Sequence, residues 1–386
     1  MNSSGTNKRR TVLKTIGGIA VASGIAGQVS ASSTITVPTD YDTINDAVDA
    51  AAPGDTVVVK DGKYREQVIV RKDLTVRGEG NPTLLPPSGN LGVGDIAVIQ
   101  PIFGARGYGN DVTFEGFTVD GEEASDKGGF YSCVGYYLAD GTIRDVELTG
   151  ADYGAYISQN RGGTPRTDLG QEVNVFDSHF EDLGLSRGVN QQLVFNEPGT
   201  TGKVQDCTFV GDKGERAFLY GLSPGYSASI KAQGNSFENF YGGSFQIALY
   251  GFNTPDCTVQ KNDFQACQFP IYVAATDRVS RTSADKFKIV KNSIDGSDVP
   301  DDLAFDSFGT TLFAEDLEED DGAVQTVNNA KIVNNDYSDL DVGVSLNATG
   351  EGVVNNTKII RNKFENVDTA IENNGGEQTK QEANRI

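Results

Sequence analysis

Two short segments place a carboxylate directly beside an arginine. "GERAFLY" contains Glu215 and Arg216, and "AATDRVSR" contains Asp277 and Arg278. A guanidinium group can bind the carboxylate of a ligand through two parallel hydrogen bonds. The alternative is a solvated ion pair between neighbours, which contributes under about 1 kcal/mol. Both segments are therefore candidates for binding an anionic group, and the fold decides whether they face a ligand.

The histidine and cysteine contents disfavour two other kinds of site. His179 is the only histidine, so a metal site with several histidine ligands is excluded. The cysteines lie far apart and without C-x-x-C spacing, which disfavours structural zinc. They are Cys133, Cys207, Cys257 and Cys267. Two disulfides in an exported protein and four buried thiols both remain open alternatives.

The first residues predict export. Arg9 and Arg10 stand side by side and precede the apolar stretch "TIGGIAVASGIAG", which ends at the small-x-small pattern "VSA". This order resembles a twin-arginine export signal. The apolar stretch is short and rich in glycine and alanine, which disfavours a membrane anchor, and no later segment has the composition of a span. We expect cleavage of residues 1–31 and a secreted protein.

The charge balance is strongly acidic. The full chain carries a net charge of -22, and removing residues 1–31 leaves 28 basic and 54 acidic side chains, a balance of -26. Nucleic acid needs basic partners and is excluded as a ligand class. Dispersed acidity with one methionine and no tryptophan resembles secreted proteins of halophilic archaea, although an ordinary acidic extracellular protein is the alternative. At molar salt the Debye length is about 3 Å, so this surface need not repel an anionic ligand.

A repeat of about thirty residues must position the candidate side chains. One apolar position recurs with spacings of 29, 32, 29, 28, 27, 30, 43 and 27 residues. It is occupied by Val119, Leu148, Phe180, Phe209, Phe237, Phe264, Ile294, Tyr337 and Phe364. Short alternating strands at this period predict an all-β parallel β-helix, whose coils stack at about 4.8 Å.

A second strand in each coil carries the candidate site. It recurs as "AYIS", "LVFN", "FLYG", "IALY", "IYVA", "TLFA", "GVSL" and "TAIE". Outward tyrosine rings there would lie against sugar faces, and amides would bind sugar hydroxyl groups. The predicted substrate-binding residues are Tyr156, Gln192, Asn196, Gln246, Tyr250 and Tyr272, with Glu197, Glu215 and Asp277 close by. The alternative is that these tyrosines simply pack well on a pleated surface.

A recurring asparagine has a structural explanation. Asn235, Asn262, Asn292, Asn335 and Asn362 each lie two residues before the repeated apolar residue. Stacked coils would place their side-chain amides above one another, where each can bond its neighbours and the backbone. We therefore predict an asparagine ladder that keeps the coils in register. Cys207 occupies the same position one coil earlier, which favours a buried thiol there.

The N-terminal coils carry a family resemblance. "DTINDAVDAA" predicts a short amphipathic helix with Ile44, Ala47 and Val48 on one face. Together with "GDTVVV", "GKYREQV" and "LTVRG", it resembles the start of pectin methylesterase-like and other pectin lyase-like proteins. The resemblance covers residues 34–374 and implies a single-domain right-handed parallel β-helix over 32–374, with this helix as its cap. Residues 375–386 lack apolar periodicity, and we expect a flexible tail.

The departures from this family narrow the implied activity. The chain lacks the tryptophan-bearing motif of pectin methylesterases, the Gly-His-Gly motif of polygalacturonases and the Asp-Pro-His-Asp segment of alginate epimerases. The remaining relatives are polysaccharide lyases, which use an Arg or Lys base and calcium-binding acids.

This resemblance implies β-elimination of a uronate polysaccharide by a monomer. The implied base is Arg216 or Arg278, and the implied calcium ligands are Glu197, Glu215 and Asp277. The alternative is a non-catalytic glycan-binding or adhesive β-helix, which the missing hydrolase and esterase motifs favour.

Overall fold

A computed structural model describes residues 32–88, 99–121, 130–159, 169–184, 190–215, 218–276, 283–316 and 324–386. The chain divides into two units, Met1–Ser32 and Ser33–Ile386, and the second contains all the described strands. The predicted export signal, residues 1–31, lies outside the described residues. So do Arg216, Asp277 and Arg278. No helix within the described ranges is long and apolar enough to cross a membrane.

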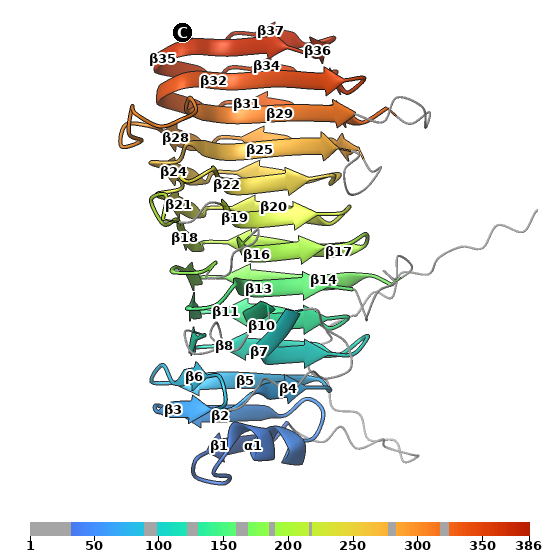
Figure 1. Ribbon diagram of the computed structural model, residues 1–386. Helices are drawn as coiled ribbons and strands as arrows, with labels where there is room; N and C mark the ends of the chain where they lie inside the picture. The colour runs from blue at the N-terminus through green and yellow to red at the C-terminus, as the bar shows by residue number, and fades with distance from the viewer. Residues whose placement is uncertain are drawn as a thin grey trace, which may run out of the picture. The chain divides into compact units, whose positions relative to one another are not determined.

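The second unit is a parallel β-helix, as the repeat predicts (Figure 1). Its first sheet has 13 parallel strands in the part of the chain that the structure describes, one from each coil. In spatial order these are β1 (Thr34–Val37), β2 (Thr56–Lys60), β5 (Leu74–Glu79), β8 (Asp111–Glu115), β11 (Asp140–Arg144), β14 (Gln171–Phe176), β17 (Thr200–Gln205), β20 (Ser229–Gln233), β23 (Thr258–Gln260), β27 (Lys288–Val290), β31 (Lys331–Val333), β34 (Lys358–Ile360) and β37 (Lys380–Glu382).

Among the described residues, the second sheet has 20 strands, most of them in two runs, one of short and one of longer strands. The short strands are β3 (Lys63–Arg65), β6 (Thr83–Leu85), β9 (Thr118–Asp120), β12 (Glu147–Thr149), β15 (His179–Phe180), β18 (Thr208–Val210), β21 (Ser236–Glu238), β24 (Asp263–Gln265) and β28 (Ser293–Asp295). The other run is β4 (Val68–Val70), β7 (Ile99–Arg106), β10 (Phe130–Tyr137), β13 (Tyr153–Ser158), β16 (Asn190–Asn196), β19 (Phe218–Gly225), β22 (Phe245–Phe252), β25 (Phe269–Thr276) and β29 (Phe308–Asp316). We call the outer surface of this second run the long-strand face.

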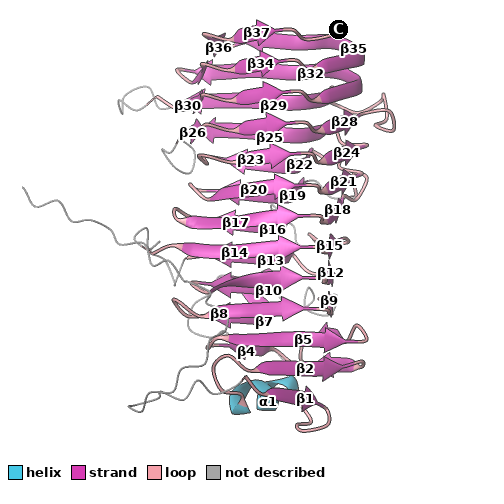
Figure 2. Cartoon of the chain, turned by 180° about the vertical axis from the view of Figure 1, so that it is seen from behind, coloured by secondary structure: helices cyan, strands magenta, loops and turns pink. Residues whose placement is uncertain are grey.

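Two longer strands and a small third sheet complete the fold. β32 (Asp336–Gly350) pairs with both β28 and β29, which joins the two runs into one sheet, and β35 (Lys363–Asn374) pairs with β32. The third sheet contains β26 (Ala284–Asp285), β30 (Thr326–Asn328), β33 (Val353–Asn355) and β36 (Gly376–Glu377). Seen from behind, the first sheet and the short-strand run lie on different sides of the same stack of coils (Figure 2).

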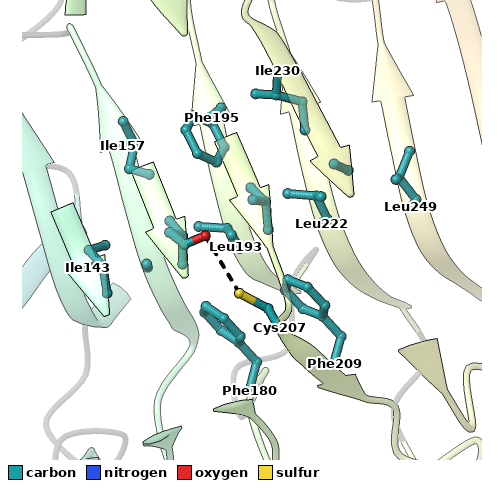
Figure 3. Packing of buried hydrophobic residues seen from close by; sticks show 14 of the residues in the cluster. Ile143, Ile157, Phe180, Leu193, Phe195, Cys207, Phe209, Leu222, Ile230 and Leu249 are labelled. Atoms are coloured by element: carbon teal, nitrogen blue, oxygen red, sulfur yellow. Dashed lines mark hydrogen bonds between the residues drawn. The ribbon is translucent and has the colours of Figure 1, made fainter. Parts of the chain in front are cut away.

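The repeated apolar residue forms the predicted interior column. Phe180, Phe209, Phe237 and Phe264 are paired in register along the short strands and are fully buried. Successive rings stack with centroids 4.7 to 4.8 Å apart, close to the spacing between coils. Figure 3 shows Phe180 and Phe209 beside Cys207 in the same interior as Leu193 and Phe195.

The predicted asparagine ladder is confirmed. Asn335, which is fully buried, donates from Nδ2 to Asn362 Oδ1 at 3.0 Å and to the Ile289 carbonyl at 3.0 Å. Its own Oδ1 accepts from both the backbone N–H and the Nδ2 of Asn292, each at 2.9 Å. The same pattern links Asn235, Asn262, Asn292 and Asn362. The asparagines therefore hold adjacent coils in register.

The cysteine alternatives are resolved in favour of thiols. Cys133, Cys207, Cys257 and Cys267 are all free and buried. Cys207 extends the asparagine ladder by donating its backbone N–H to Asn235 Oδ1 at 3.0 Å. Burial, the largest influence, raises the pKa of the Cys207 thiol to about 12. These cysteines serve as small core residues.

The N-terminal helix forms as predicted. Helix α1 (Ile44–Ala50) begins at Thr43, whose Oγ1 accepts from the Asp46 N–H at 3.1 Å, and it buries Ile44, Ala47 and Val48. It lies beside β1 and β2 at the first coil (Figure 1). The helix therefore covers apolar surface of that coil, as a cap does.

The C-terminal boundary of the β-helix differs from the prediction. Residues 375–386, expected to be a tail beyond the solenoid, instead contribute β36 and β37, which pair in parallel with β33 and β34. Asn384 Oδ1 accepts from Asn362 N–H and Nδ2, so the ladder gains a further member. Apolar periodicity could not reveal this partial coil because its residues are mostly exposed and hydrogen bonds hold it in place.

Candidate functional site

The register of the long strands places a row of side chains on the long-strand face. Tyr156 lies opposite Val194, Val194 opposite Ser223, and Tyr250 opposite Tyr272. Ser223 also lies opposite Tyr250, because these two residues directly follow the paired residues Leu222 and Leu249. The row therefore has aromatic residues at both ends and small residues between them.

The small residues leave a cavity above β16, β19 and β22. Its volume is about 290 Å³. It is lined by Gln191, Val194, Asn196, Tyr220, Ser223, Gly225, Tyr226, Tyr250 and Phe252. Three tyrosines and a phenylalanine thus surround a floor that includes a serine and a glycine, with two side-chain amides within reach. A largely apolar pocket with a few polar groups is typical of small-ligand sites.

Gly225 keeps the floor of this cavity open. A Cβ atom at this position would lie 3.8 Å from Asn196 Oδ1 and 3.8 Å from the Phe252 carbonyl oxygen. These are ordinary van der Waals separations, and the backbone of Gly225 does not have a positive φ. The glycine is therefore not required by the backbone, and a larger residue would occupy the cavity.

A left-handed turn places Tyr226 at the cavity. Tyr226 and Ser227 follow β19 with φ angles of 49° and 69°, a region that non-glycine residues adopt at a cost. Backbone N–H groups of both residues donate to the next coil, to Phe252 and Asn253. The Tyr226 ring packs edge-on against Phe252, with centroids 5.4 Å apart. Positive φ angles recur at many non-glycine residues in the turns of the described coils, so this turn follows from the architecture of the repeat.

The tyrosine hydroxyl groups of the cavity are neutral at physiological pH. Tyr250 packs against Tyr220 at 4.8 Å and Phe252 at 5.5 Å between ring centroids. Burial raises the pKa of Tyr220 to about 12 and raises that of Tyr250 well above its usual value. Each neutral hydroxyl can donate one hydrogen bond and also accept.

Four of the six predicted substrate-binding residues come together here. Asn196 and Tyr250 line the cavity. Asn196 Nδ2 donates to the Tyr156 hydroxyl at 3.1 Å, which connects Tyr156 to the cavity wall. Tyr272 packs against Tyr250, with ring centroids 5.9 Å apart. These four residues therefore lie along one surface that spans five coils, from β13 to β25.

The outward orientation predicted for Gln192 and Gln246 is wrong. Both side chains are fully buried. Gln192 Nε2 donates to the Val210 carbonyl at 2.6 Å, and Gln246 Nε2 donates to Asp212 Oδ1 at 2.5 Å. On β16, Gln191 and Val194 both line the cavity, so the two residues between them face inward. Because the two-residue alternation is interrupted here, the period of the strand does not predict which side chains face outward.

The two described candidates for calcium binding lie at opposite ends of the parallel strands. Glu197 follows β16, is 5% exposed and accepts from Ser158 Oγ at 2.8 Å. Glu215 is exposed and precedes β19, the strand paired with β16. A strand of seven residues spans about 23 Å, so one calcium ion cannot bind both carboxylates at 2.3–2.6 Å. In the described part of the chain, no three His, Cys, Asp or Glu side chains are grouped to hold a metal.

Several cavity residues were not predicted from the sequence. They are Gln191, Val194, Tyr220, Ser223, Gly225, Tyr226 and Phe252. The available signal was the pairing of "LSPGYS" with "LYGF" in successive coils, where small residues meet aromatic ones. Knowing which of these residues face outward required the register.

Comparisons with known proteins identify the fold. No protein-family model and no curated protein sequence matches the chain. The catalytic unit of a thermostable GH87 α-1,3-glucanase from Streptomyces thermodiastaticus is similar with a TM-score of 0.52 at 13% identity, over 94% of this chain and 70% of that one.

Two further structures have TM-scores of 0.50. The A-module of the mannuronan C-5 epimerase AlgE6 from Azotobacter vinelandii is 15% identical, over 87% of this chain and 93% of its own. An alginate lyase from Paenibacillus sp. is 12% identical, over 90% of this chain and 99% of the lyase. At these identities the similarity shows the fold alone: the chain is a right-handed parallel β-helix, and the three structures named are polysaccharide-acting enzymes.

Proposed function

We propose that the protein binds polysaccharide on the long-strand face, with one sugar unit in the cavity between β16 and β22. The observation that carries this proposal is the cavity lined by Tyr220, Tyr226, Tyr250 and Phe252. Aromatic rings pack against the C–H faces of sugars, and the amides of the cavity can bind sugar hydroxyl groups. The polysaccharide substrates named for the structural neighbours support the same ligand class.

An extended chain fits the arrangement of the coils. The aromatic residues of the face continue on both sides of the cavity, with Tyr137 and Tyr156 on one side and Tyr272 and Phe313 on the other. Neighbouring strands lie about 4.8 Å apart, so these rings follow the stacking direction at regular intervals. The proposal includes export by the twin-arginine pathway, which rests on residues 1–31 of the sequence.

Replacing Tyr250 by alanine should raise the dissociation constant for a bound polysaccharide about five- to thirtyfold, because it removes one aromatic wall worth about 1–2 kcal/mol. Isothermal titration of the full chain against neutral and uronate oligosaccharides measures this effect. Tyr250→Phe is the matched control and should bind within about threefold of the unchanged protein. Absence of binding to every glycan tested would contradict the proposal.

Tyr226→Asn provides a second variant that keeps the backbone. Asparagine adopts positive φ more readily than tyrosine does, so this change should preserve the turn while removing the ring. Binding should weaken without loss of thermal stability. If Tyr226→Asn and Tyr250→Ala both bind glycan normally, the ligand lies elsewhere.

A catalytic form of this function is the elimination of uronate units. Glu215 comes directly before Arg216 and precedes β19, the strand that supplies Tyr220 to the cavity. Thr276 comes directly before Asp277 and ends β25, the strand that supplies Tyr272. Glu215 and Thr276 therefore border the long-strand face. In this reaction a base takes the proton from the carbon beside the uronate carboxylate, and a carbon–carbon double bond forms at the new chain end as the glycosidic C–O bond breaks. The leaving oxygen keeps the electron pair of that bond, takes up a proton and becomes a hydroxyl group of the other product. We propose Arg216 or Arg278 as that base.

This form implies calcium, which would neutralise the uronate carboxylate. The described residues do not assemble a site for the ion, and no step is assigned to it. The proposed calcium ligands are Asp277 together with either Glu197 or Glu215.

The elimination can be followed by the ultraviolet absorbance of unsaturated chain ends. Full-length protein in about molar salt, with calcium, should produce this signal on a uronate polymer. Chelation should abolish it, and Arg216→Ala or Arg278→Ala should reduce the rate at least about a hundredfold, the usual scale for a general base. A silent assay on every uronate polymer, with glycan binding intact, would rule out the lyase and leave a non-catalytic binding protein.

A further inference from the structure

One outward-facing column of the first sheet consists almost entirely of lysines. Parallel pairing from β17 to β37 places the following residues in line, one from each coil (Figure 2): Lys203, Lys231, Thr258, Lys288, Lys331, Lys358 and Lys380. We call these residues the lysine column. Ile289, Ile332 and Ile359, which directly follow three of the lysines, are fully buried, so the lysines face solvent. Six pairings at about 4.8 Å give the column a length of about 29 Å.

This run of like charges is unexpected from the composition of the chain. The chain has 54 acidic and 32 basic side chains, yet all six charged residues of the lysine column are basic. Like charges that lie directly opposite each other on neighbouring strands repel and are destabilising. A column that served only to stabilise the sheet would alternate the two signs.

The other end of the same sheet shows that alternation. Lys60 lies opposite Glu79, and Lys60 Nζ is 2.6 Å from Glu79 Oε2. Glu115 lies between Arg77 and Arg144 on the neighbouring strands. Opposite charges therefore face each other at this end, whereas the lysines have no carboxylate directly opposite them.

Like-charged carboxylates elsewhere in this sheet have a structural role that the lysines lack. Asp140 lies opposite Asp111, and Asp140 Oδ1 accepts from the Glu172 N–H at 2.7 Å. Among the described residues, the one ion pair of the lysine column joins Lys380 to Glu382 at 2.8 Å, on the last strand. The ammonium groups of the other lysines are therefore available to a ligand.

The adjacent outward column is uncharged as far as β34. Two residues beyond the lysine column, the same strands hold the partly exposed residues Gln205, Gln233, Gln260, Val290, Val333 and Ile360. Amides can bind sugar hydroxyl groups, and aliphatic side chains can pack against the C–H faces of sugars. None of the six is aromatic, whereas single-stranded nucleic acid is bound by stacking of its bases on aromatic rings. The two columns together therefore suit a polysaccharide with anionic groups.

Cations also occupy the turns that follow three of these strands. Lys261, Lys291 and Arg361 come directly after β23, β27 and β34, and all three are exposed. Asp206 holds the same position after β17, so the basic surface is strongest toward β37.

From these observations we infer that the lysine column binds an extended polysaccharide that carries one carboxylate or sulfate on each sugar unit. Anionic groups bound along the column remove the repulsion between neighbouring lysines. The lysine spacing of about 4.8 Å differs from the spacing of about 3.4 Å between phosphates along one DNA strand. This surface belongs to the first sheet, whereas the cavity lies on the long-strand face of the second sheet. It is thus a second binding surface, beyond the proposed function.

Titration of the full chain with three polymers tests this inference. Polygalacturonate carries carboxylates, dextran sulfate carries sulfates, and dextran is the neutral counterpart of the latter. The salt concentration is raised from about 0.15 M to about 1 M, and circular dichroism checks the fold at each step. At least one of the two anionic polymers should bind, with an affinity that falls as salt rises, and it identifies the anionic group. Dextran should not compete with it.

Three combined substitutions locate the binding. Lys288→Gln, Lys331→Gln and Lys358→Gln together should weaken binding of the anionic polymer between about threefold and about a hundredfold, since each removes one exposed ion pair. Replacing the same three lysines by arginine keeps the charge and should change the affinity less than about threefold.

A matched control removes the same charge from other exposed positions. Lys63→Gln, Arg71→Gln and Arg77→Gln together lower the net charge equally, and these residues lie outside the lysine column. This variant should bind the anionic polymer as the unchanged protein does. An equal loss in the control would show that binding depends on net charge alone and would overturn the inference.

The remaining outcomes separate this surface from the cavity. Tyr250→Ala should leave binding of the anionic polymer unchanged. If Tyr250→Ala abolishes that binding and the triple glutamine variant retains it, the polymer binds on the long-strand face and the inference is wrong, while the proposed function stands. Failure of both anionic polymers to bind at about 0.15 M salt would also overturn the inference. Tighter binding of single-stranded DNA than of either polymer would contradict the assignment to a polysaccharide.

Discussion

Asn335→Ala should lower the free energy of unfolding by about 4 kcal/mol, because a buried donor or acceptor left without a partner costs about 1–3 kcal/mol. The Asn335 side chain takes part in four hydrogen bonds and is fully buried. Its loss leaves the Asn292 backbone N–H without an acceptor and removes side-chain hydrogen bonds to the coils on both sides. Urea denaturation followed by circular dichroism measures the change.

Asn384→Ala is the matched control from the same ladder. Asn384 receives the same two hydrogen bonds from Asn362, but it is only partly buried and ends the ladder among the described residues. Water can replace its partners, so the expected loss is about 1 kcal/mol or less. Equal losses for Asn335→Ala and Asn384→Ala would show that the ladder does not stabilise the coils through buried hydrogen bonds.

Phe237→Ala should cost about 4 kcal/mol, within the range of 3–5 kcal/mol for deleting a buried phenylalanine. Phe237 is fully buried between Phe209 and Phe264, at 4.8 and 4.7 Å between ring centroids. The backbone spacing of the coils limits how far these rings can move into the cavity that alanine leaves. The same denaturation experiment measures the loss.

Two variants test whether loss of packing in the stacked phenylalanine column causes the expected destabilisation of Phe237→Ala. Phe237→Leu retains most of the volume and should cost about 1–2 kcal/mol. Phe218→Ala removes a phenylalanine that is 39% exposed and should cost less than about 1 kcal/mol. A loss for Phe237→Ala no greater than that for Phe218→Ala would contradict the role given to the column.

The architecture and the outer cavity use separate sets of residues. The ladder residue Asn335 and the column residue Phe237 face the interior, whereas Tyr226, Tyr250 and Gly225 line the outer cavity. Each coil needs its interior positions for register and packing. The outer positions of β19 can therefore vary, and small residues there create a cavity without loss of the fold.

The local assignments that failed have a common cause. Gln192 and Gln246 were placed outside on a strict two-residue alternation, but the long strands turn two consecutive residues inward. The turn that places Tyr226 over the cavity needs a left-handed backbone conformation. A tyrosine in the sequence does not predict that conformation. Side-chain direction at such points is a property of the paired coils.

By itself, the sequence determined the period of the coils, the asparagine ladder, the phenylalanine column and the capping helix. Each follows from a residue type that recurs at one interval, and stacking at a constant spacing converts that interval directly into contact. Only the tertiary structure decided the thiol state, the final partial coil and the cavity. These depend on which residues of different coils face one another, and a cavity arises where Ser223 and Gly225 fail to fill the space between larger neighbours.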